Sequence, residues 1–346
     1  MSGGVDSTVA ALLLKDKYDI TGITMQLWAD GVDVPEGLDH PYDQNSRDAK
    51  EIADALNFPH VSVALGETFK ENVIRPFIAE YRRGNTPNPC VECNRTLKFG
   101  KLFDIADGLG IKYLATGHYA RIECDENGAF HLKKATDLSK DQSYFLWSIK
   151  RDKLSRIIFP LGRMSKPEIR KMAALNGFSS ASRSDSQDIC FIPDGDYISF
   201  IEKHDGAISP QGSFVDTEGN ILGTHEGIER YTIGQRKGLG IALGVPMFVG
   251  KKNILDNTVT LCSDLELYKT SLIAHSVNIL EDISFDTPKR LEAKIRYRHT
   301  PAIATVKAID GGRLAIEFDL PQRAIASGQS VVLYDGDTVV AGGIIE

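Results

Sequence analysis

Two cysteines stand three residues apart in the segment NTPNPCVECNRTLKFG, which covers positions 85–100. A Cys-x-x-Cys pair such as Cys90 and Cys93 can be half of a zinc site, a redox disulfide, a pair of iron–sulfur ligands or a reactive thiol with a neighbour. The thiolate is the reactive form, and basic residues beside it, here Arg95 and Lys98, lower a thiol pKa. We also expect Cys93 to lie near a helix N-terminus, which acts in the same direction.

A second motif with chemical potential, SGGVDS, occupies residues 2–7 and leads directly into a segment with helical spacing. Two adjacent glycines let the backbone approach a phosphate, and the following helix N-terminus offers unpaired N–H groups. Ser2 and Ser7 add hydroxyl donors, while Asp6 can help to hold Mg²⁺. The pattern lacks the GxxxxGK[ST] of the common P-loop. The alternative is a glycine-rich helix cap without a ligand, which needs fewer polar side chains than are present.

The elements that must position these residues alternate between helix and strand in the first half of the chain. Helical patterns cover 6–17, 45–57, 67–83, the residues after Asn94, and 165–178; strand patterns cover 18–28, 60–65 and 111–117. We expect Ser165 to cap the last of these helices, Pro167 to lie in its first turn and Gly177 to end it. The 111–117 strand reads as buried. Such alternation predicts an α/β fold with a doubly wound parallel sheet and sites at the carboxyl ends of its strands.

The pattern changes after about residue 192, where glycine and proline become frequent and helical patterns scarce. From about residue 256, short β-rich runs are separated by turn signals such as DGG and DGD, which is typical of a small closed or sandwich-like β domain. The sequence therefore predicts three parts: a catalytic α/β domain over 1–192, a central β-rich domain over 193–255 and a C-terminal β-barrel over 256–346.

Composition describes an ordinary globular chain of 346 residues, with 42% hydrophobic and 25% charged residues. No apolar run approaches the roughly 18–20 residues of a membrane span, and the N-terminus lacks the pattern of a signal peptide. The cysteine count is odd, at five, and suits a reducing cytosol better than a disulfide framework. We therefore expect a cytoplasmic protein with no membrane partner.

The net charge of −7 argues against a chain that coats nucleic acid without specificity. The segment 289–307 departs from this balance, because it carries six lysines or arginines against one acid, Glu292. Taken alone, such a run is most simply a solvated strand face.

The SGGVDS motif before a helix resembles the signature of the PP-loop ATP pyrophosphatases, which cut ATP to AMP and pyrophosphate while adenylating a substrate. Further segments resemble one family of that superfamily, the tRNA-specific 2-thiouridylases. They are, in chain order, TPNPCVECNRTLKFG, ATGHYAR, KDQSYFL, DICFI, TIGQRKGLGI, IRYRHT and SGQSVVLYDGDTVVAGGIIE. The resemblance spans the whole chain. In this family a strand normally precedes the phosphate loop, whereas only Met1 precedes Ser2, so we expect the first strand of the α/β domain to be missing from this sequence.

The resemblance implies that the C2 oxygen of the wobble uridine of a tRNA is replaced by sulfur. ATP, with Mg²⁺, first adenylates that oxygen, and AMP leaves as sulfur attacks C2. The implied partners are tRNA and a sulfur-donor protein. Cys93 is implied as the nucleophile, Cys190 of DICFI as the carrier of a persulfide, and Asp6 as a catalytic residue of the loop. Without the resemblance, Cys190 between two apolar neighbours reads as an ordinary buried cysteine.

Cys90 departs from the family pattern, because many members carry aspartate at this position. Three cysteines, Cys90, Cys93 and Cys190, would leave one corner of a [4Fe–4S] cluster open to hold a sulfide. Persulfide relay and transfer from a cluster therefore both remain open. A structural zinc site is less favoured, because no second Cys-x-x-Cys or histidine pair supplies the remaining ligands.

The resemblance also implies the residues that bind the two substrates, one of which is a base turned out of its stack into a pocket. ATP is expected at Met1, Ser2, Gly3, Gly4, Val5, Asp6, Ser7, Met25 and Gly117. The tRNA is expected at Asn88, Pro89, Cys90, His118, Lys140, Asp141, Gln142, Arg296, Tyr297 and Gln329. Arg296 and Tyr297 lie within 289–307, so the resemblance implies that this basic segment is a phosphate-binding face rather than a solvated one. For His118 the alternative is a structural histidine.

The glycine-rich stretch GLGIALG, at 238–244, superficially suggests a dinucleotide loop, but no helix is predicted after it. We instead expect a segment around 230–250 that orders when tRNA binds. Two alternatives to the thiouridylase hypothesis stay open. One is another PP-loop adenylating enzyme acting on tRNA, such as a lysidine synthetase, which has no need of cysteines at 93 and 190. The other is a non-catalytic nucleotide- and RNA-binding protein.

Overall fold

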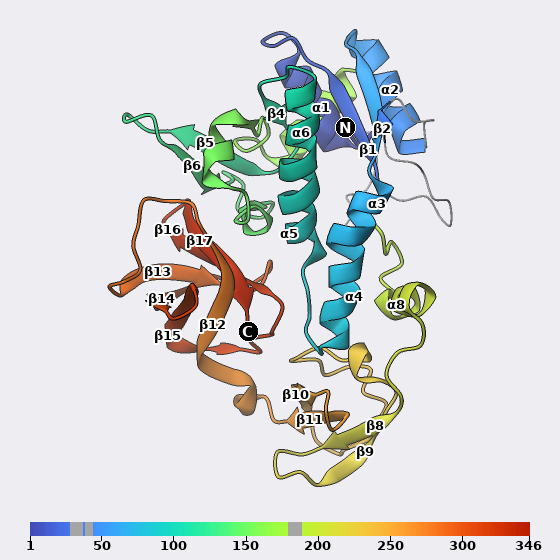
Figure 1. The fold of residues 1–346 in the computed structure, drawn as a ribbon, viewed down its shortest axis with the longest axis vertical. Coiled ribbons are helices and arrows are strands. Elements are labelled where there is room, and N and C mark those ends of the chain that lie inside the picture. Colours follow the sequence, from blue (N-terminus) through green and yellow to red (C-terminus); the bar gives the residue numbers. More distant parts are fainter. Residues whose placement is uncertain (28–36, 39–43, 179–188) are drawn as a thin grey trace. The chain divides into compact units, whose positions relative to one another are not determined.

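The computed structural model describes residues 1–27, 37–38, 44–178 and 189–346, in which the chain forms two compact units (Figure 1). Unit 1 comprises Met1–Ile74, Cys90–Gln187 and Asp337–Val339. Unit 2 comprises Arg75–Pro89, Asp188–Gly336 and Val340–Glu346. Residues 28 and 188, which belong to the predicted strand 18–28 and to the DICFI motif, lie outside the described residues.

Unit 1 opens with a β/α alternation. Its elements are α1 (Val5–Leu14), β1 (Gly22–Gln26), β2 (Gly37–Leu38), α2 (Gln44–Leu56) and β3 (His60–Ala64). β1 pairs in parallel with β3, from Gly22 opposite His60 to Gln26 opposite Ala64, and β2 joins the other edge of β3. The helices predicted over 6–17 and 45–57 and the strand predicted over 60–65 are confirmed. The strand predicted from residue 18 begins only at Gly22, because Lys17 and Tyr18 still donate to Leu14 in the last turn of α1.

The next stretches are helical but not purely α-helical. α3 (Gly66–Phe69) runs through a π-helical turn at Lys70–Ile74 into α4 (Arg75–Arg82), and α5 (Pro89–Cys93) runs through a second π-helical stretch at Asn94–Lys101 into α6 (Leu102–Gly108). The predicted helix 67–83 is therefore confirmed, with a π turn inside it. The helix predicted to follow Asn94 begins earlier, at Pro89, because proline with its fixed φ suits the first helical position. Such π-helical turns are frequent at functional sites.

The rest of unit 1 contains short strands and one capped helix. The elements are β4 (Leu114–Ala115), β5 (Ala120–Cys124), β6 (Phe130–Lys134), β7 (Ile157–Ile158) and α7 (Lys166–Leu175). β4 and β7 form a two-stranded parallel sheet. The expectation of a buried strand over 111–117 is wrong: Ala115 is exposed, because a two-residue strand in a two-stranded sheet has little cover.

Helix α7 packs its apolar face against α1. Val5 and Val9 of α1 share a buried cluster with Ile169 and Ala173 of α7. The cap predicted for α7 is confirmed: Ser165 forms a capping box with Glu168, and Gly177 follows the helix with φ of 76°. This packing fixes the first turn of α7 close to the first turn of α1.

Unit 2 contains a four-stranded sheet and one further helix. The sheet has the order β10 (Phe248–Asn253), β11 (Thr258–Cys262), β8 (Gly212–Val215) and β9 (Ile221–His225). Helix α8 (Tyr197–Asp205) precedes it and is capped by Asp196, which accepts from the backbone of Ser199. The sequence pattern did not predict α8.

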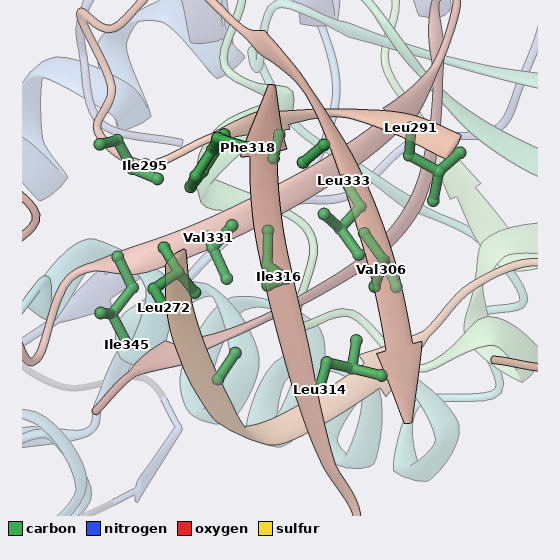
Figure 2. Close-up of a cluster of buried hydrophobic side chains, with 14 of the residues drawn as sticks. Leu272, Leu291, Ile295, Val306, Leu314, Ile316, Phe318, Val331, Leu333 and Ile345 are labelled. Atoms are coloured by element: carbon green, nitrogen blue, oxygen red, sulfur yellow. The ribbon is translucent and has the colours of Figure 1, made fainter. Parts of the chain in front are cut away.

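The remaining strands of unit 2 close into a barrel. They are β12 (Tyr268–Ile279), β13 (Lys289–Lys294), β14 (Ala302–Ile309), β15 (Arg313–Arg323), β16 (Ser330–Asp335) and β17 (Thr338–Ile345). Their order is β12-β15-β14-β13-β16-β17, and β12 also pairs with β17, which removes both free edges. Inward side chains such as Leu272, Ile316 and Leu333 fill the interior (Figure 2). The predicted closed β domain is confirmed.

Candidate active site

The serine hydroxyl groups of the phosphate loop, residues 2–7, form hydrogen bonds within the loop itself. Gly3 has φ of 67°, and a Cβ there would lie 2.8 Å from the Cβ of Asp48, so only glycine fits. The hydroxyls of Ser2 and Ser7 are 3.3 Å apart, and Ser7 also donates to the carbonyl of Gly4 at 3.0 Å. Gly4, the N-cap residue of α1, has extended backbone and no side chain of its own that could accept from the first N–H groups of the helix. The first N–H groups of α1 are therefore available to an anion.

Asp6 is held by side chains from two other segments of unit 1. The Nζ of Lys166 lies 2.9 Å from both carboxylate oxygens, and the hydroxyl of Tyr119 donates to Oδ1 at 2.6 Å. Lys166 is only 8% exposed and its Nζ lies 5.6 Å from the centre of the Tyr119 ring. Gly117 is equally close: a Cβ there would be 2.9 Å from the carbonyl carbon of Asp6. A buried cation thus stands beside the loop expected to bind phosphates.

Sequence reasoning missed Lys166 and Tyr119. One signal was present for Lys166: it is the first residue of α7, where the helix dipole disfavours a cation. A lysine in that position suggests a compensating interaction elsewhere, which here is the ion pair with the carboxylate of Asp6. Tyr119 had no such signal, because its partner lies 113 residues away in the chain.

The loop does not by itself make a cation site for Mg²⁺. Both oxygens of Asp6 already accept from Lys166, and no group of three or more His, Cys, Asp or Glu side chains among the described residues is placed to hold a metal ion. Mg²⁺ commonly binds through one or two carboxylates together with substrate phosphates. The carboxylate of Asp6 therefore fits as one ligand of an Mg²⁺ ion that also binds the phosphates of a nucleotide.

The Cys-x-x-Cys motif forms α5, with Asn88 immediately before the helix and Pro89 as its first residue. Cys90 is exposed and Cys93 is buried. The expectation that Cys93 lies near a helix N-terminus is wrong, because the helix begins four residues earlier and continues through Asn94. The guanidinium of Arg95 pairs with Glu92 at 2.5 Å, so that cation is partly neutralised.

Helix α5 is anchored by the segment that follows the KDQ motif. Asn94 is 3% exposed and donates to the carbonyl of Phe145 at 2.9 Å, while Ser148 donates to the carbonyl of Val91 at 3.3 Å. These bonds fix the helix on both sides of Cys93.

The KDQ residues shape a turn in this structure. Asp141 is 4% exposed and accepts from the backbone of Ala135 at 2.9 Å and from the hydroxyl of Ser143 at 2.8 Å. Gln142 accepts from the backbone of Tyr119 at 3.0 Å, which links this turn to the tyrosine beside Asp6. Lys140 is partly exposed. Contact of these residues with tRNA stays a prediction.

His118 lies between two phenylalanine rings of unit 1. Its ring centre is 5.9 Å from that of Phe99 and 5.8 Å from that of Phe159, and its Nδ1 is 2.7 Å from the hydroxyl of Thr116. Burial, with the charge of Lys98 as a smaller cause, holds the pKa of His118 well below its usual value. The ring is therefore neutral at neutral pH, and its contact with tRNA stays a prediction.

The other residues expected at ATP lie around the loop or on β1. Met25 is in β1 opposite Val63 of β3, and Val5 is buried in the contact between α1 and α7. Met1 is partly buried and its amino group donates to the carbonyl of Ile23 in β1. The backbone contact of Met25 with adenine stays a prediction.

Cys190 belongs to unit 2, whereas Cys90 and Cys93 belong to unit 1. The alternative of an ordinary buried cysteine is wrong, because Cys190 is exposed. The apolar anchor is its neighbour Phe191, whose ring lies 5.5 Å from Phe77 and 5.1 Å from Phe200. The meeting of Cys93 with Cys190 during a reaction stays a prediction.

The residues expected to bind tRNA from the barrel are partly engaged within unit 2. Arg296, in the turn after β13, donates to the carbonyl of Arg323 at 2.8 Å, and Lys294 lies over the ring of Tyr297. Gln329 donates to the carbonyl of Thr86 at 2.7 Å. The GLGIALG stretch leads into β10 rather than a helix, as the rejection of a dinucleotide loop predicted.

Comparison with known families agrees with this arrangement. Residues 1–194 match the model of the tRNA methyl transferase HUP domain, and 198–263 match the tRNA methyl transferase PRC-barrel domain. Residues 269–345 match the aminomethyltransferase beta-barrel domain. The three matches follow the order α/β unit, central sheet and closed barrel. None of the helices in the described ranges is long and apolar enough to cross a membrane.

Curated relatives match over the full length of the chain. The tRNA-specific 2-thiouridylase MnmA of Clostridioides difficile is 46% identical over 350 residues, which cover all of this chain and 96% of the relative. The enzyme of the same name from Heliobacterium modesticaldum is 47% identical over 352 residues, all of this chain and 91% of the relative. That of Acetivibrio thermocellus is 45% identical and 98% covered.

Proposed function

The chain belongs to the tRNA-specific 2-thiouridylase family, and on that premise we propose that it uses ATP to replace the C2 oxygen of the wobble uridine of tRNA with sulfur. The observation that carries the proposal is that one compact unit holds both the SGGVDS loop at the start of α1 and Cys93. Full-length identity to 2-thiouridylases makes this function better supported than another adenylating enzyme or a non-catalytic RNA-binding protein.

The loop residues Ser2–Ser7 would bind the phosphates of ATP through the hydroxyls of the two serines and the first N–H groups of α1. The uridine C2 oxygen then attacks the α-phosphorus, and pyrophosphate leaves. Asp6 would help to hold Mg²⁺, which would neutralise phosphate charge when bound. Asp6, held by Lys166 and Tyr119, fixes the loop geometry and keeps a buried cation beside the phosphates. Met25 and Gly117 complete the proposed nucleotide site.

The sulfur step we favour uses two cysteines. The terminal sulfur of a persulfide on Cys190 attacks C2, and AMP leaves with the former C2 oxygen. The Cys93 thiolate then attacks the Cys190 sulfur, which breaks the bond to the transferred sulfur and leaves a Cys93–Cys190 disulfide. The bond pair remains on the transferred sulfur, which becomes the thiocarbonyl. An external thiol reduces the disulfide, and a sulfur-donor protein restores the persulfide.

We infer that Asn88, Pro89 and Cys90 face the extruded base and that His118, Lys140, Asp141, Gln142, Arg296 and Tyr297 contact the tRNA, as the family resemblance implies. We place the reaction in the cytoplasm and assign the three parts to 1–192, 193–255 and 256–346. For the cluster alternative the candidate ligands are Cys90 and Cys93 of unit 1 and Cys190 of unit 2. We derive no step through a [4Fe–4S] cluster.

The test of the proposed function is thiolation of an in vitro transcribed tRNA with ATP and a persulfide-generating donor. Cys93→Ser and Cys190→Ser should each abolish 2-thiouridine formation while ATP binding stays within about twofold, because neither thiol lies in the phosphate loop. Cys124→Ser, which changes an exposed cysteine outside the motifs, is the matched control and should retain activity.

Thiolation that persists in either variant would remove that cysteine from the reaction. Iron and acid-labile sulfide are measured on the same preparations, purified without oxygen. Roughly four of each per chain, lost in Cys90→Asp, would replace the persulfide relay by the cluster mechanism.

A further inference from the structure

The turn between β15 and β16 of the barrel is hydrogen-bonded to the segment that precedes the Cys-x-x-Cys helix. The turn and this segment both belong to unit 2. The N–H of Thr86 donates to the carbonyl of Ser327 at 2.8 Å, and the side-chain amide of Gln329 donates to the carbonyl of Thr86 at 2.7 Å. Both backbone polar groups of Thr86 are therefore bound to one three-residue turn. We call Ser327–Gly328–Gln329 together with Thr86 the clasp.

Gly328 makes the close approach possible. It has φ of 86°, and a Cβ at this position would lie 3.0 Å from the Cβ of Asn85 and 3.1 Å from the nitrogen of Thr86. A side chain there would both strain the turn and push the segment away. The turn itself is fixed to β17, because Gly328 donates to Ile345 and Ile345 donates back to Gln329.

The other side of the segment is tied to α4. Asn85 donates from its side chain to Glu80 at 2.6 Å, and its backbone N–H donates to the carbonyl of Glu80 at 2.9 Å. The segment is thus held between the end of a helix and a turn of the barrel.

Two residues, Pro87 and Asn88, connect Thr86 of the clasp to Pro89, the first residue of α5, and the backbone of this stretch has little freedom. Pro87 and Pro89 fix their own φ angles, and the residue before a proline is restricted to extended backbone, which applies to Thr86 and to Asn88. A displacement of Thr86 should therefore also displace Asn88 and the start of α5, because the restricted backbone angles between them cannot compensate for it.

We propose that the clasp is a positioning element of the active site, in which Gln329 acts by holding Thr86. The proposal rests on the proposed function, in which Asn88 and Pro89 face the target base. Through the clasp, the barrel sets the place of the base-recognising residues. Misplacing catalytic groups by about 1 Å can cost on the order of 100-fold in rate, so loss of the clasp should act on the rate of the reaction more than on substrate binding.

The test compares Gln329→Met, which keeps the side-chain length but cannot donate, with Gly328→Ala, which wedges the turn. Gly312→Ala is the matched control, since it also has positive φ, of 68°, in a barrel turn but has open space around its Cβ. We expect both clasp variants to slow single-turnover thiolation at saturating tRNA roughly 10- to 100-fold, with the tRNA Kd changed less than about twofold. The control should match the wild type in rate.

Two results would overturn the proposal. One is weakened tRNA binding in Gln329→Met with an unchanged rate at saturation, which would make Gln329 an RNA contact. The other is a wild-type rate in both clasp variants. Hydrogen exchange at the Thr86 amide supplies a readout that does not need the reaction: it should speed up in Gln329→Met, and unchanged protection would also count against the clasp. If the wild-type chain fails to thiolate tRNA, the proposed function is lost, while the exchange measurement still decides whether the clasp holds its segment.

Discussion

At the scale of single residues, the phosphate loop predicted from the sequence lies beside a buried lysine that the sequence analysis missed. SGGVDS predicts a phosphate site from glycines, serines and the start of a helix, and the structure has the conformation that this prediction needs. Lys166 joins it only through folding, since the pairing with Asp6 spans 160 residues and depends on the packing of α7 against α1. A pairing between residues so far apart in the chain cannot be predicted from local sequence patterns.

Lys166→Gln should weaken ATP use. The buried ammonium stands beside the loop, and a hydrogen bond to a charged group contributes about 1.5–3 kcal/mol, so we expect roughly a 10- to 100-fold loss in kcat/KM for ATP in tRNA-dependent pyrophosphate release. Lys171→Gln, an exposed position on the same helix, is the control. An unchanged kcat/KM for ATP in Lys166→Gln would show that the ammonium only supports the fold.

At the scale of elements, periodicity located the helices of the α/β part but missed α8. The limits and internal irregularities of the elements depended on their partners. α5 starts at Pro89 and runs through a π-helical stretch, neither of which follows from an apolar repeat. β4 shrinks to two residues because it has one neighbouring strand in the described sheet, and strand pairing is a non-local property. The candidate cysteines could thus be identified from the sequence, but their exposure could not: Cys93 is buried and Cys190 is exposed.

The pairing of β1 with β3 should make unit 1 sensitive to acid. His60 on β3 bonds to Thr24 of β1 at 2.8 Å, and burial, followed by the nearby N-terminal amino group and Lys50, lowers the pKa of His60 from 6.5 to about 4. A histidine with a lowered folded pKa stays neutral in the native state while the unfolded state takes up a proton. Its contribution to stability is therefore complete above pH 6.5 and is lost as the pH falls from 6.5 towards 4.

Between pH 7 and pH 5 this single group should remove about 2 kcal/mol from the free energy of unfolding of unit 1. The measurement is urea unfolding followed by tryptophan fluorescence, to which the buried Trp147 of unit 1 contributes. His60→Gln should flatten the pH dependence by that amount, whereas His275→Gln, in the barrel, should not. Equal slopes in wild type and His60→Gln would contradict the assignment.

At the scale of the whole molecule, the net charge is negative, whereas one local segment is positively charged. The chain carries a net charge of −7, yet the 289–307 segment is basic, so tRNA binding should depend on a few local cations. The structure reduces their number, because Arg290 forms two bonds with Asp319, at 2.6 and 2.5 Å. The sequence could predict the basic segment and the barrel that contains it, but not which cations are already engaged.

Arg296→Ala should weaken binding of all accepted tRNAs to a similar degree and reduce the slope of log K against log salt by about 0.7–1, as expected for the loss of one phosphate contact. Filter binding over a series of salt concentrations measures both quantities. Arg313→Ala removes an arginine of the same barrel outside the basic segment and should leave the slope unchanged. An unaltered slope in Arg296→Ala would place the phosphate contact elsewhere.

The strand β17 has a consequence for the order in which the protein is made. Its residues 340–345 close the barrel against β12, while Asp337–Val339 belong to unit 1, where Thr338 pairs with Lys133 of β6 and Asp337 bonds to Arg121. Among the described residues, every other strand of both units precedes β17 in the chain, so a ribosome translates it before it reaches these residues. Neither unit can therefore reach its finished form before β17 has been synthesised, and a nascent chain stalled before residue 337 would expose unpaired strand edges in both. Completion of this one strand is thus needed both by the unit that contains the phosphate loop and by the unit that contains the barrel.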